Sequence, residues 1–226
     1  MTFRVPVAAS AAGLASGAGA AVGAVAFAEL EIKKSRFLAF VGRTDTEEDA
    51  REFIHRVRGA YPDARHHCSA FIVHVDGAQP ILRSSDDGEP SGTAGKPMLD
   101  VLTGSRLENI TAVVVRYFGG IKLGTGGLVR AYSDTTAAAL ASVGIAVRAQ
   151  QLLFTVVASH TVAGRLATDL RGAGFEIVDT HYAEAVTFTI AVEPADADRL
   201  TGFLAAATAG EVTAQAAGTA WVERRQ

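Results

Sequence analysis

Apolar residues recur along this chain at two spacings, and together they predict a protein of mixed α and β structure. The clearest helical stripe, with intervals of three and four residues, contains Ala50, Phe53, Ile54, Val57 and Tyr61. Thr46 precedes this stripe, Asp49 stands three residues later at capping-box spacing, and Pro62 follows. One amphipathic helix is therefore predicted between Thr46 and Pro62.

Short runs of β-branched and aromatic residues predict the strands in the first half of the chain. These runs cover residues 27–32, 36–43, 67–75, 79–83 and 111–117. Lys33-Lys34-Ser35 separates the first two runs, which are therefore predicted to pair as a hairpin. Pro97, at a first helical position, predicts a short helix. A longer helix is predicted over residues 127–143, with Gly144 as its end.

The second half of the chain repeats a simpler pattern. Strands are predicted over 152–158, 175–181, 186–193 and 211–222, and helices over 161–172 and 194–207. This βαββαβ order is that of the ferredoxin-like split unit. The predicted fold class is α+β with two domains. A lead-in over 1–26 precedes an N-terminal domain of mixed sheet and helices over 27–148, and a ferredoxin-like C-terminal domain follows over 149–226.

The lead-in contains an uncharged, Ala- and Gly-rich stretch from Val5 to Ala28. Its length matches a bilayer span, and Ala26-Phe27-Ala28 resembles a signal-peptidase site. The stretch holds few of the large apolar residues that drive membrane insertion. We therefore expect a cytoplasmic protein with a flexible N-terminal segment and no membrane partner.

Composition narrows the possible functions. The 226 residues are 49% hydrophobic and 20% charged, with a net charge of −3. No global positive field draws such a chain to nucleic acid, so RNA binding requires a local basic patch. Cys68 is the single cysteine, which excludes an internal disulfide.

A glycine-rich loop is predicted between strand 111–117 and the helix that follows it. The residues predicted to bind an anion or nucleic acid there are Arg116, Gly119, Gly120, Lys122, Gly124, Thr125, Gly126, Gly127 and Arg130. Glycines leave backbone amides uncovered, and a helix N-terminus beside cations attracts phosphate. The spacing is neither that of a P-loop nor G-x-G-x-x-G. The alternative is a turn whose glycines serve only close packing of strand and helix.

A second polar loop, SSDDGEPSGTAGK over residues 84–96, concentrates carboxylates. Its candidate residues, with two histidines that can line the same cleft, are His66, His67, Asp86, Asp87, Glu89, Ser91, Thr93 and Lys96. Such carboxylates can hold Mg²⁺, act as acid and base, or contact a basic partner. The alternative is a solvated turn. A cleft shared by this loop and the glycine loop would favour an enzyme.

The neighbouring Arg65-His66-His67-Cys68 contains residue types that bind zinc. In a strand, however, His66 and Cys68 face one side and His67 the other, and no further ligand motif accompanies them. Neither a metal nor another cofactor is predicted, and no catalytic residue is assigned. Cys68 is expected to be a small buried apolar residue.

Four segments carry a family resemblance: EIKKSRF, PDARHHCSAF, SSDDGEPSGTAGKPML and ITAVVVRYFGGIKLGTGGLVRAY. In this order, from Glu31 to about Leu140, they closely resemble the IMPACT/YigZ family. The second domain resembles the small C-terminal domain of bacterial YigZ-type members. The resemblance implies a first domain similar in fold to a domain of a small-subunit ribosomal protein, and a second comparable with a domain of elongation factor G. It also implies a link to translation, since eukaryotic relatives act in translational control, but it implies no catalytic residues.

Three functions are consistent with these features. The favoured one is a non-catalytic regulator that binds RNA, the ribosome or a translation factor through the locally basic glycine loop. The second is an enzyme acting on a phosphorylated small molecule, with Asp86, Asp87 and Glu89 as metal ligands or base and Lys96 neutralising charge. The third is an adaptor that docks partners on its ferredoxin-like domain. A phosphate-containing ligand is compatible with the first two.

Overall fold

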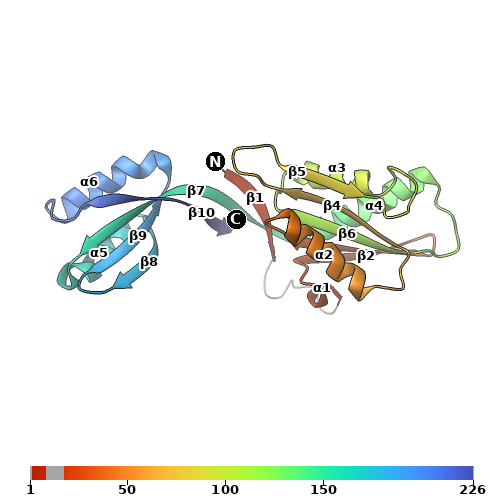
Figure 1. The fold of residues 1–226 in the computed structure, drawn as a ribbon, viewed down its shortest axis with the longest axis horizontal. Helices are drawn as coiled ribbons and strands as arrows, with labels where there is room; N and C mark the ends of the chain where they lie inside the picture. Colours follow the sequence, from red (N-terminus) through yellow and green to blue (C-terminus); the bar gives the residue numbers. More distant parts are fainter. Residues whose placement is uncertain (1, 9–17, 226) are drawn as a thin grey trace. The chain divides into compact units, whose positions relative to one another are not determined.

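The computed structural model describes residues 2–8 and 18–225, which form two compact units. Residues 3–147 make up the first unit and residues 148–224 the second. Each unit combines one antiparallel sheet system with helices (Figure 1). The predicted α+β class with two domains is confirmed.

The first unit is built on a five-stranded antiparallel sheet with strand order β2-β3-β6-β4-β5. Its strands are β2 (Ala26–Ile32), β3 (Ser35–Arg43), β4 (His66–Val73), β5 (Ile81–Ser85) and β6 (Ile110–Tyr117). The central strand β6 is buried on both faces from Ile110 to Arg116. Its apolar run is therefore continuous instead of alternating.

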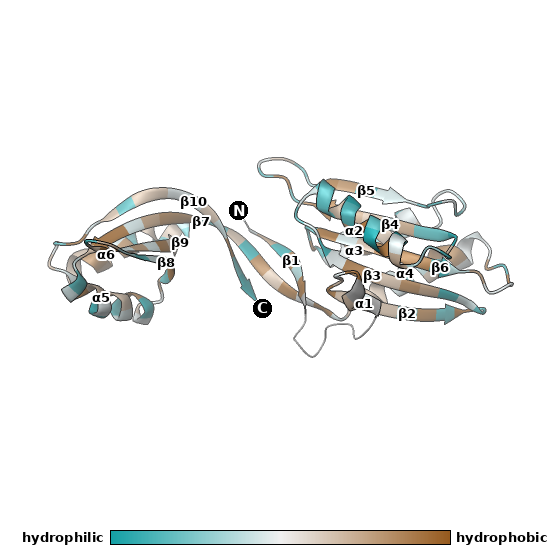
Figure 2. Cartoon of the chain, turned by 60° about the horizontal axis from the view of Figure 1, so that its bottom comes forward, coloured by the Kyte–Doolittle hydropathy of each residue, from teal (hydrophilic) through white to brown (hydrophobic). Residues whose placement is uncertain are grey.

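Helices cover both faces of this sheet. They are α2 (Glu47–Ala60), α3 (Gly95–Ser105) and α4 (Thr125–Leu140). Phe37 and Val41 of β3 belong to the core under α3 and α4, whereas Phe40 packs with Phe53 and Val57 of α2. Figure 2 shows α2 with a hydrophilic outer side above mainly apolar strands. The first unit is thus a three-layer structure of helix, sheet and helices.

Local signals of the sequence set several element ends correctly. The capping box of α2 is present: Thr46 Oγ1 accepts a hydrogen bond from the Asp49 amide, and the Asp49 carboxylate accepts one from the Thr46 amide. The β2–β3 hairpin turns at Lys33 and Lys34, whose φ angles are 49° and 62°. Positive φ at both positions is typical of the two-residue turns that match strand twist.

Predicted and observed helix boundaries differ at several ends, including the start of α6 (Ala197–Ala207), which was predicted at residue 194 and lies at Ala197. Helix α3 begins at Gly95, two residues before Pro97. Proline is tolerated there because the first-turn amides of a helix have no intrahelical acceptor. Helix α4 ends at Leu140, and Gly144 lies inside strand β7 (Val143–Ala158) instead of ending the helix. Strand β7 therefore starts nine residues earlier than predicted, and it pairs with β1, a strand that the sequence pattern did not predict.

Parts of the expected flexible lead-in form regular structure. Residues Thr2–Ala8 form β1, which pairs with β7, and Ala18–Ala21 form the short helix α1. Phe3 stacks on His74 with ring centroids 3.9 Å apart, and Val5 is fully buried. Residues 1 and 9–17 of the predicted lead-in lie outside the described residues. Within the described residues, no helix combines the length and apolar character that crossing a bilayer requires.

The second unit has the predicted βαββαβ order. After β7 come α5 (His160–Gly172), β8 (Glu176–Tyr182), β9 (Val186–Val192), α6 (Ala197–Ala207) and β10 (Ala214–Arg225), with a short 3₁₀ turn before α6. Strands β7, β9 and β8 are neighbours in that order, and β10 pairs with β7. This is the ferredoxin-like strand order. Its core includes Leu166, Leu170, Ile190, Leu200 and Leu204.

Candidate functional site

Asp86 organises the acidic loop from its centre. Its Oδ1 accepts hydrogen bonds from the amides of Ala94 (3.0 Å) and Gly95 (2.8 Å), and its Oδ2 accepts one from Gly92 (2.8 Å). These amides include the first of helix α3, whose N-cap residue Ala94 has no side chain able to cap it. Asp86, eight residues before the N-cap position, therefore caps helix α3 in place of a local side chain. Burial alone raises the pKa of this carboxyl, but the three amide donors outweigh it, and the pKa lies below its usual range.

Asp87 is also committed to the fold. Its Oδ1 accepts a hydrogen bond from Arg58 Nη2 at 2.7 Å, and its Oδ2 accepts one from the His67 amide at 2.7 Å. Its φ of 42° places it in the left-handed region at the tip of the loop. Two of the three carboxylates that the sequence offered as metal ligands, those of Asp86 and Asp87, are thus held by protein donors.

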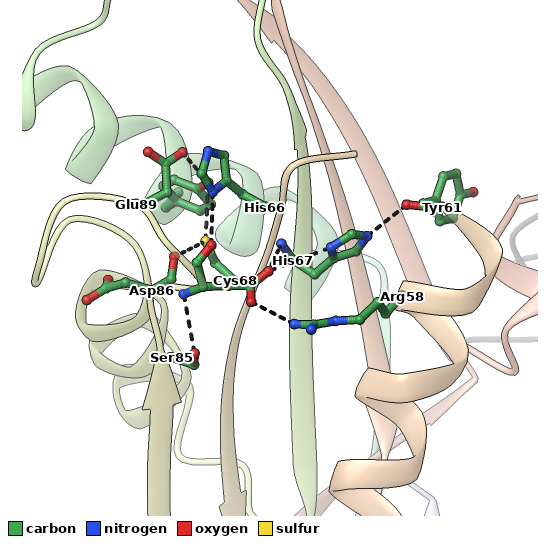
Figure 3. A network of polar contacts seen from close by, with 10 residues as sticks. Arg58, Tyr61, His66, His67, Cys68, Ser85, Asp86 and Glu89 are labelled. Atoms are coloured by element: carbon green, nitrogen blue, oxygen red, sulfur yellow. Dashed lines mark hydrogen bonds and ion pairs between the residues drawn. The ribbon is translucent and has the colours of Figure 1, made fainter. Parts of the chain in front are cut away.

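The two histidine rings are held through different nitrogen atoms. His66 Nδ1 donates to the Asp87 carbonyl oxygen at 2.9 Å, and His67 Nε2 donates to the Tyr61 carbonyl oxygen at 2.9 Å (Figure 3). A carbonyl oxygen only accepts, so each of these ring nitrogens carries hydrogen. Among the described residues, no group of three or more His, Cys, Asp and Glu side chains has the geometry to hold a metal ion.

A buried polar network runs from the acidic loop to the glycine loop. Glu89 Oε1 accepts hydrogen bonds from Arg116 Nη1 (2.5 Å) and from the Tyr132 hydroxyl (2.8 Å). The Cys68 thiol lies 3.3 Å from that hydroxyl and 3.0 Å from the Asp86 carbonyl oxygen. Burial raises the pKa of Cys68 to about 12 and also raises that of Tyr132. Both groups are therefore neutral at pH 7, and Cys68 is the inert buried residue that the sequence predicted.

The glycines of the second loop serve different purposes. A Cβ on Gly119 would collide with the backbone of Lys34 and Ser35, and its amide donates to Ser35 Oγ at 3.2 Å. Gly119 is thus required for close packing, and its amide is already hydrogen-bonded within the fold. Gly124 is the N-cap of α4 with φ of 74°, and no side chain caps this helix. The amides of Thr125, Gly126 and Gly127 have no hydrogen-bond partner outside the helix among the described residues.

Both loops line one pocket of about 420 Å³. Of the candidate residues, the pocket brings together His66, Glu89, Arg116, Lys122, Gly124 and Thr125. The candidates outside its lining are His67, Asp86, Asp87, Ser91, Thr93, Lys96, Gly119, Gly120, Gly126, Gly127 and Arg130. Lys96 instead pairs with Asp100 of its own helix, and Thr93 Oγ1 donates to the Pro90 carbonyl oxygen.

The remaining lining residues are Arg65, Pro90, Phe118, Leu123 and Leu128, none of which the sequence marked as candidates. Phe118 could have been recognised from the sequence, because it is a large aromatic residue directly before the glycines, where the strand has already left the core. Arg65 stands beside the candidate His66, but only the pairing of β4 with β6 shows that it reaches the glycine loop.

The pocket is positively charged. Its lining holds Arg65, Lys122 and Arg116 against the single carboxylate of Glu89. Arg65 and Lys122 are exposed and form no ion pair with any described residue. Arg116 is only 6% exposed, and its Nε finds no hydrogen-bond partner in the described part of the chain. With the N-terminus of α4 at the same pocket, the arrangement attracts anions.

Substitution of Asp86 by alanine is expected to lower the free energy of unfolding by about 2 kcal/mol at pH 7, the upper range for losing a helix cap. Because the folded-state pKa is depressed, this stabilisation exists above the unfolded value of about 3.9 and is lost as pH falls through the folded value. Urea unfolding at pH 7 and at about pH 3 measures both effects. An equal difference at the two pH values would contradict a charge-dependent cap.

The fold defines a two-domain α+β protein whose first unit contains a positively charged pocket. Residues 33–140 match the model of the Impact N-terminal domain, and residues 156–211 match a domain of unknown function, DUF1949. The chain is 39% identical to the IMPACT family member YvyE of Bacillus subtilis over 183 residues, covering 81% of this chain and 83% of the relative. The chain therefore belongs to the IMPACT family.

Two further comparisons agree with this membership. The IMPACT family member YigZ of Escherichia coli is 59% identical over 102 residues, which cover 45% of this chain and 50% of the relative. A crystal structure of a hypothetical protein matches with a TM-score of 0.59 and 35% identity, covering 96% of this chain and 97% of that one. The family resemblance predicted from the four sequence segments is confirmed.

Proposed function

We propose that this protein is a non-catalytic regulator associated with translation, and that it binds RNA through the pocket between its two loops. The observation that carries the proposal is the pocket's chemistry: three cations, one carboxylate and an uncapped helix N-terminus. Phosphate groups are bound in this way by charged side chains and backbone amides. The acidic chain as a whole, at −3, then contacts RNA through one local patch.

Family membership supports the translational part of the proposal. The chain belongs to the IMPACT family, and the resemblance described above implies a link to translational control through the eukaryotic members. The physical part rests on residues of this chain alone. RNA, free or within the ribosome, carries the phosphate groups that such a patch contacts.

The double substitution R65A/K122A is expected to weaken RNA binding about tenfold or more at low salt. It is also expected to flatten the dependence of log K on log salt, since each lost phosphate contact removes about 0.7 from the slope for single-stranded RNA. Filter binding across a salt series and co-sedimentation with ribosomes measure the two effects. Both side chains are exposed, so the fold is expected to be retained.

The matched control is R51A/R56A, which removes two arginines from α2, a helix that does not line the pocket. Each pairs with a glutamate one turn away, at 2.7 and 2.9 Å. Equal weakening by the two double variants would mean that only overall charge matters, and would reject the pocket as the RNA site. Affinity of the parent protein that does not change with salt would reject phosphate contacts.

An enzyme acting on a phosphorylated small molecule is the second candidate function, because one observation favours it: both loops line the same pocket. The residues change, however. Asp86 and Asp87 are held by protein donors, and Glu89 Oε1 accepts from Arg116 and Tyr132, so His66 and the second oxygen of Glu89 are the groups left to face a substrate. Phosphate release from nucleotides that disappears in a H66A variant would favour this function over binding alone.

A further inference from the structure

One wall of the pocket is apolar, which phosphate binding alone does not require. Phe118 is 52% exposed and lines the pocket with Leu123, Leu128 and Pro90. The guanidinium of Arg116 lies 5.6 Å from the centre of the Phe118 ring. An open aromatic face beside an anion site suits a nucleobase, because stacking contributes about 1–3 kcal/mol per base and accepts any base.

Arg116 indicates a ligand independently of the helix N-terminus. Only its Nη1 is used by Glu89, and the buried Nε has no hydrogen-bond partner among the described residues. A buried, unpaired donor on a charged group is costly, and a bound oxyanion beside the guanidinium offsets this cost. His66 Nε2 also has no hydrogen-bond partner among the residues that the structure describes, whereas Nδ1 donates to the Asp87 carbonyl oxygen.

The size and charge of the pocket limit what it can hold. About 420 Å³ lies at the small end of the range for small-molecule sites, roughly 300–1,000 Å³. With histidine counted as neutral, the lining side chains carry a net charge of +2. A phosphate monoester carries about −1.5 to −2 at pH 7, whereas each internal phosphodiester of RNA carries one negative charge. The balance favours a terminal phosphate over an internal one.

We propose that the pocket binds one nucleoside monophosphate unit, either as the free nucleotide or as the phosphorylated end of an RNA strand. The phosphate lies at the N-terminus of α4 between Lys122 and Arg116, and the base stacks on Phe118. The proposal rests on the proposed function, since it assigns the ligand of the same pocket.

Isothermal titration with AMP, adenosine and inorganic phosphate tests the proposal on the full chain. AMP is expected to bind at least tenfold more tightly than either fragment. F118A is expected to weaken AMP about tenfold while leaving inorganic phosphate unchanged. I121A is the matched control, because Ile121 is 43% exposed in the same loop and does not line the pocket. It is expected to leave AMP binding unchanged.

Two RNA oligomers of one sequence, with a terminal phosphate or a terminal hydroxyl, distinguish the two sources. Preference for the phosphorylated oligomer over AMP supports an RNA end, and the reverse supports the free nucleotide. The proposal is overturned if AMP binds no more tightly than inorganic phosphate, or if F118A and I121A change AMP binding equally. If F118A and the terminal phosphate have no effect while R65A/K122A still weakens RNA, RNA binding stands and this inference fails. If AMP binds and RNA does not, the inference stands and the RNA function fails.

Discussion

Replacing Glu89 with alanine is expected to destabilise the first unit by about 3–5 kcal/mol, the cost of breaking a buried ion pair on one side. The side chains of Glu89 and Arg116 are 4% and 7% exposed. Alanine leaves the Arg116 charge buried without its partner, and it also removes the acceptor of the Tyr132 hydroxyl. Urea unfolding of the parent and E89A at pH 7 measures the difference.

Two further variants separate charge from packing. E29A removes an exposed ion pair with Arg36, whose side chains are 40% and 52% exposed, and is expected to cost no more than about 1 kcal/mol. The double variant E89M/R116M replaces the buried pair with apolar side chains of similar length and is expected to recover most of the loss. Two outcomes would contradict a buried charge as the cause: E89A lowering the free energy of unfolding no more than E29A, or the double variant being less stable than E89A.

Replacing Gly119 with alanine is expected to destabilise the protein by about 3 kcal/mol or more, above the usual cost of one added methyl group. The new Cβ would lie against the carbonyl group of Lys34 and the amide of Ser35, closer than real Cβ atoms approach any atom. These neighbours are backbone of the β2–β3 turn, so relief requires the hairpin to move away from strand β6. The midpoint and slope of urea unfolding report the loss.

Gly126 is the matched control for Gly119. It is the second residue of helix α4, and an added Cβ would meet nothing within 4 Å. G126A is expected to be neutral or to stabilise the protein by up to about 1 kcal/mol through helix propensity. Equal stability of G119A and G126A would mean that the loop adapts freely and that Gly119 has no packing role. The comparison also separates the two purposes of glycine in one loop.

The chemistry of the two loops was only partly visible in the sequence. The sequence showed the glycine loop beside a helix start, the basic residues around it and the carboxylate cluster. Six of the seventeen residues assigned from these features line the pocket. Asp86 and Asp87 have the composition of a metal site, yet their oxygens accept hydrogen bonds from amides and from Arg58. A list of residue types does not tell which donors will reach a carboxylate: those of Asp87 come from other segments, and those of Asp86 depend on how its own loop folds back.

The sequence by itself determined the elements whose cause is local. Periodicity and the Thr46–Asp49 box predicted α2, and the βαββαβ order predicted the second unit. Only the tertiary structure decided that Glu89 and Arg116 meet 27 residues apart, that Arg65 joins them, and that β1 pairs with β7. Periodicity records which face of an element is buried. It carries no information on which side chains from distant parts of the sequence share that face, and a binding pocket consists of such side chains.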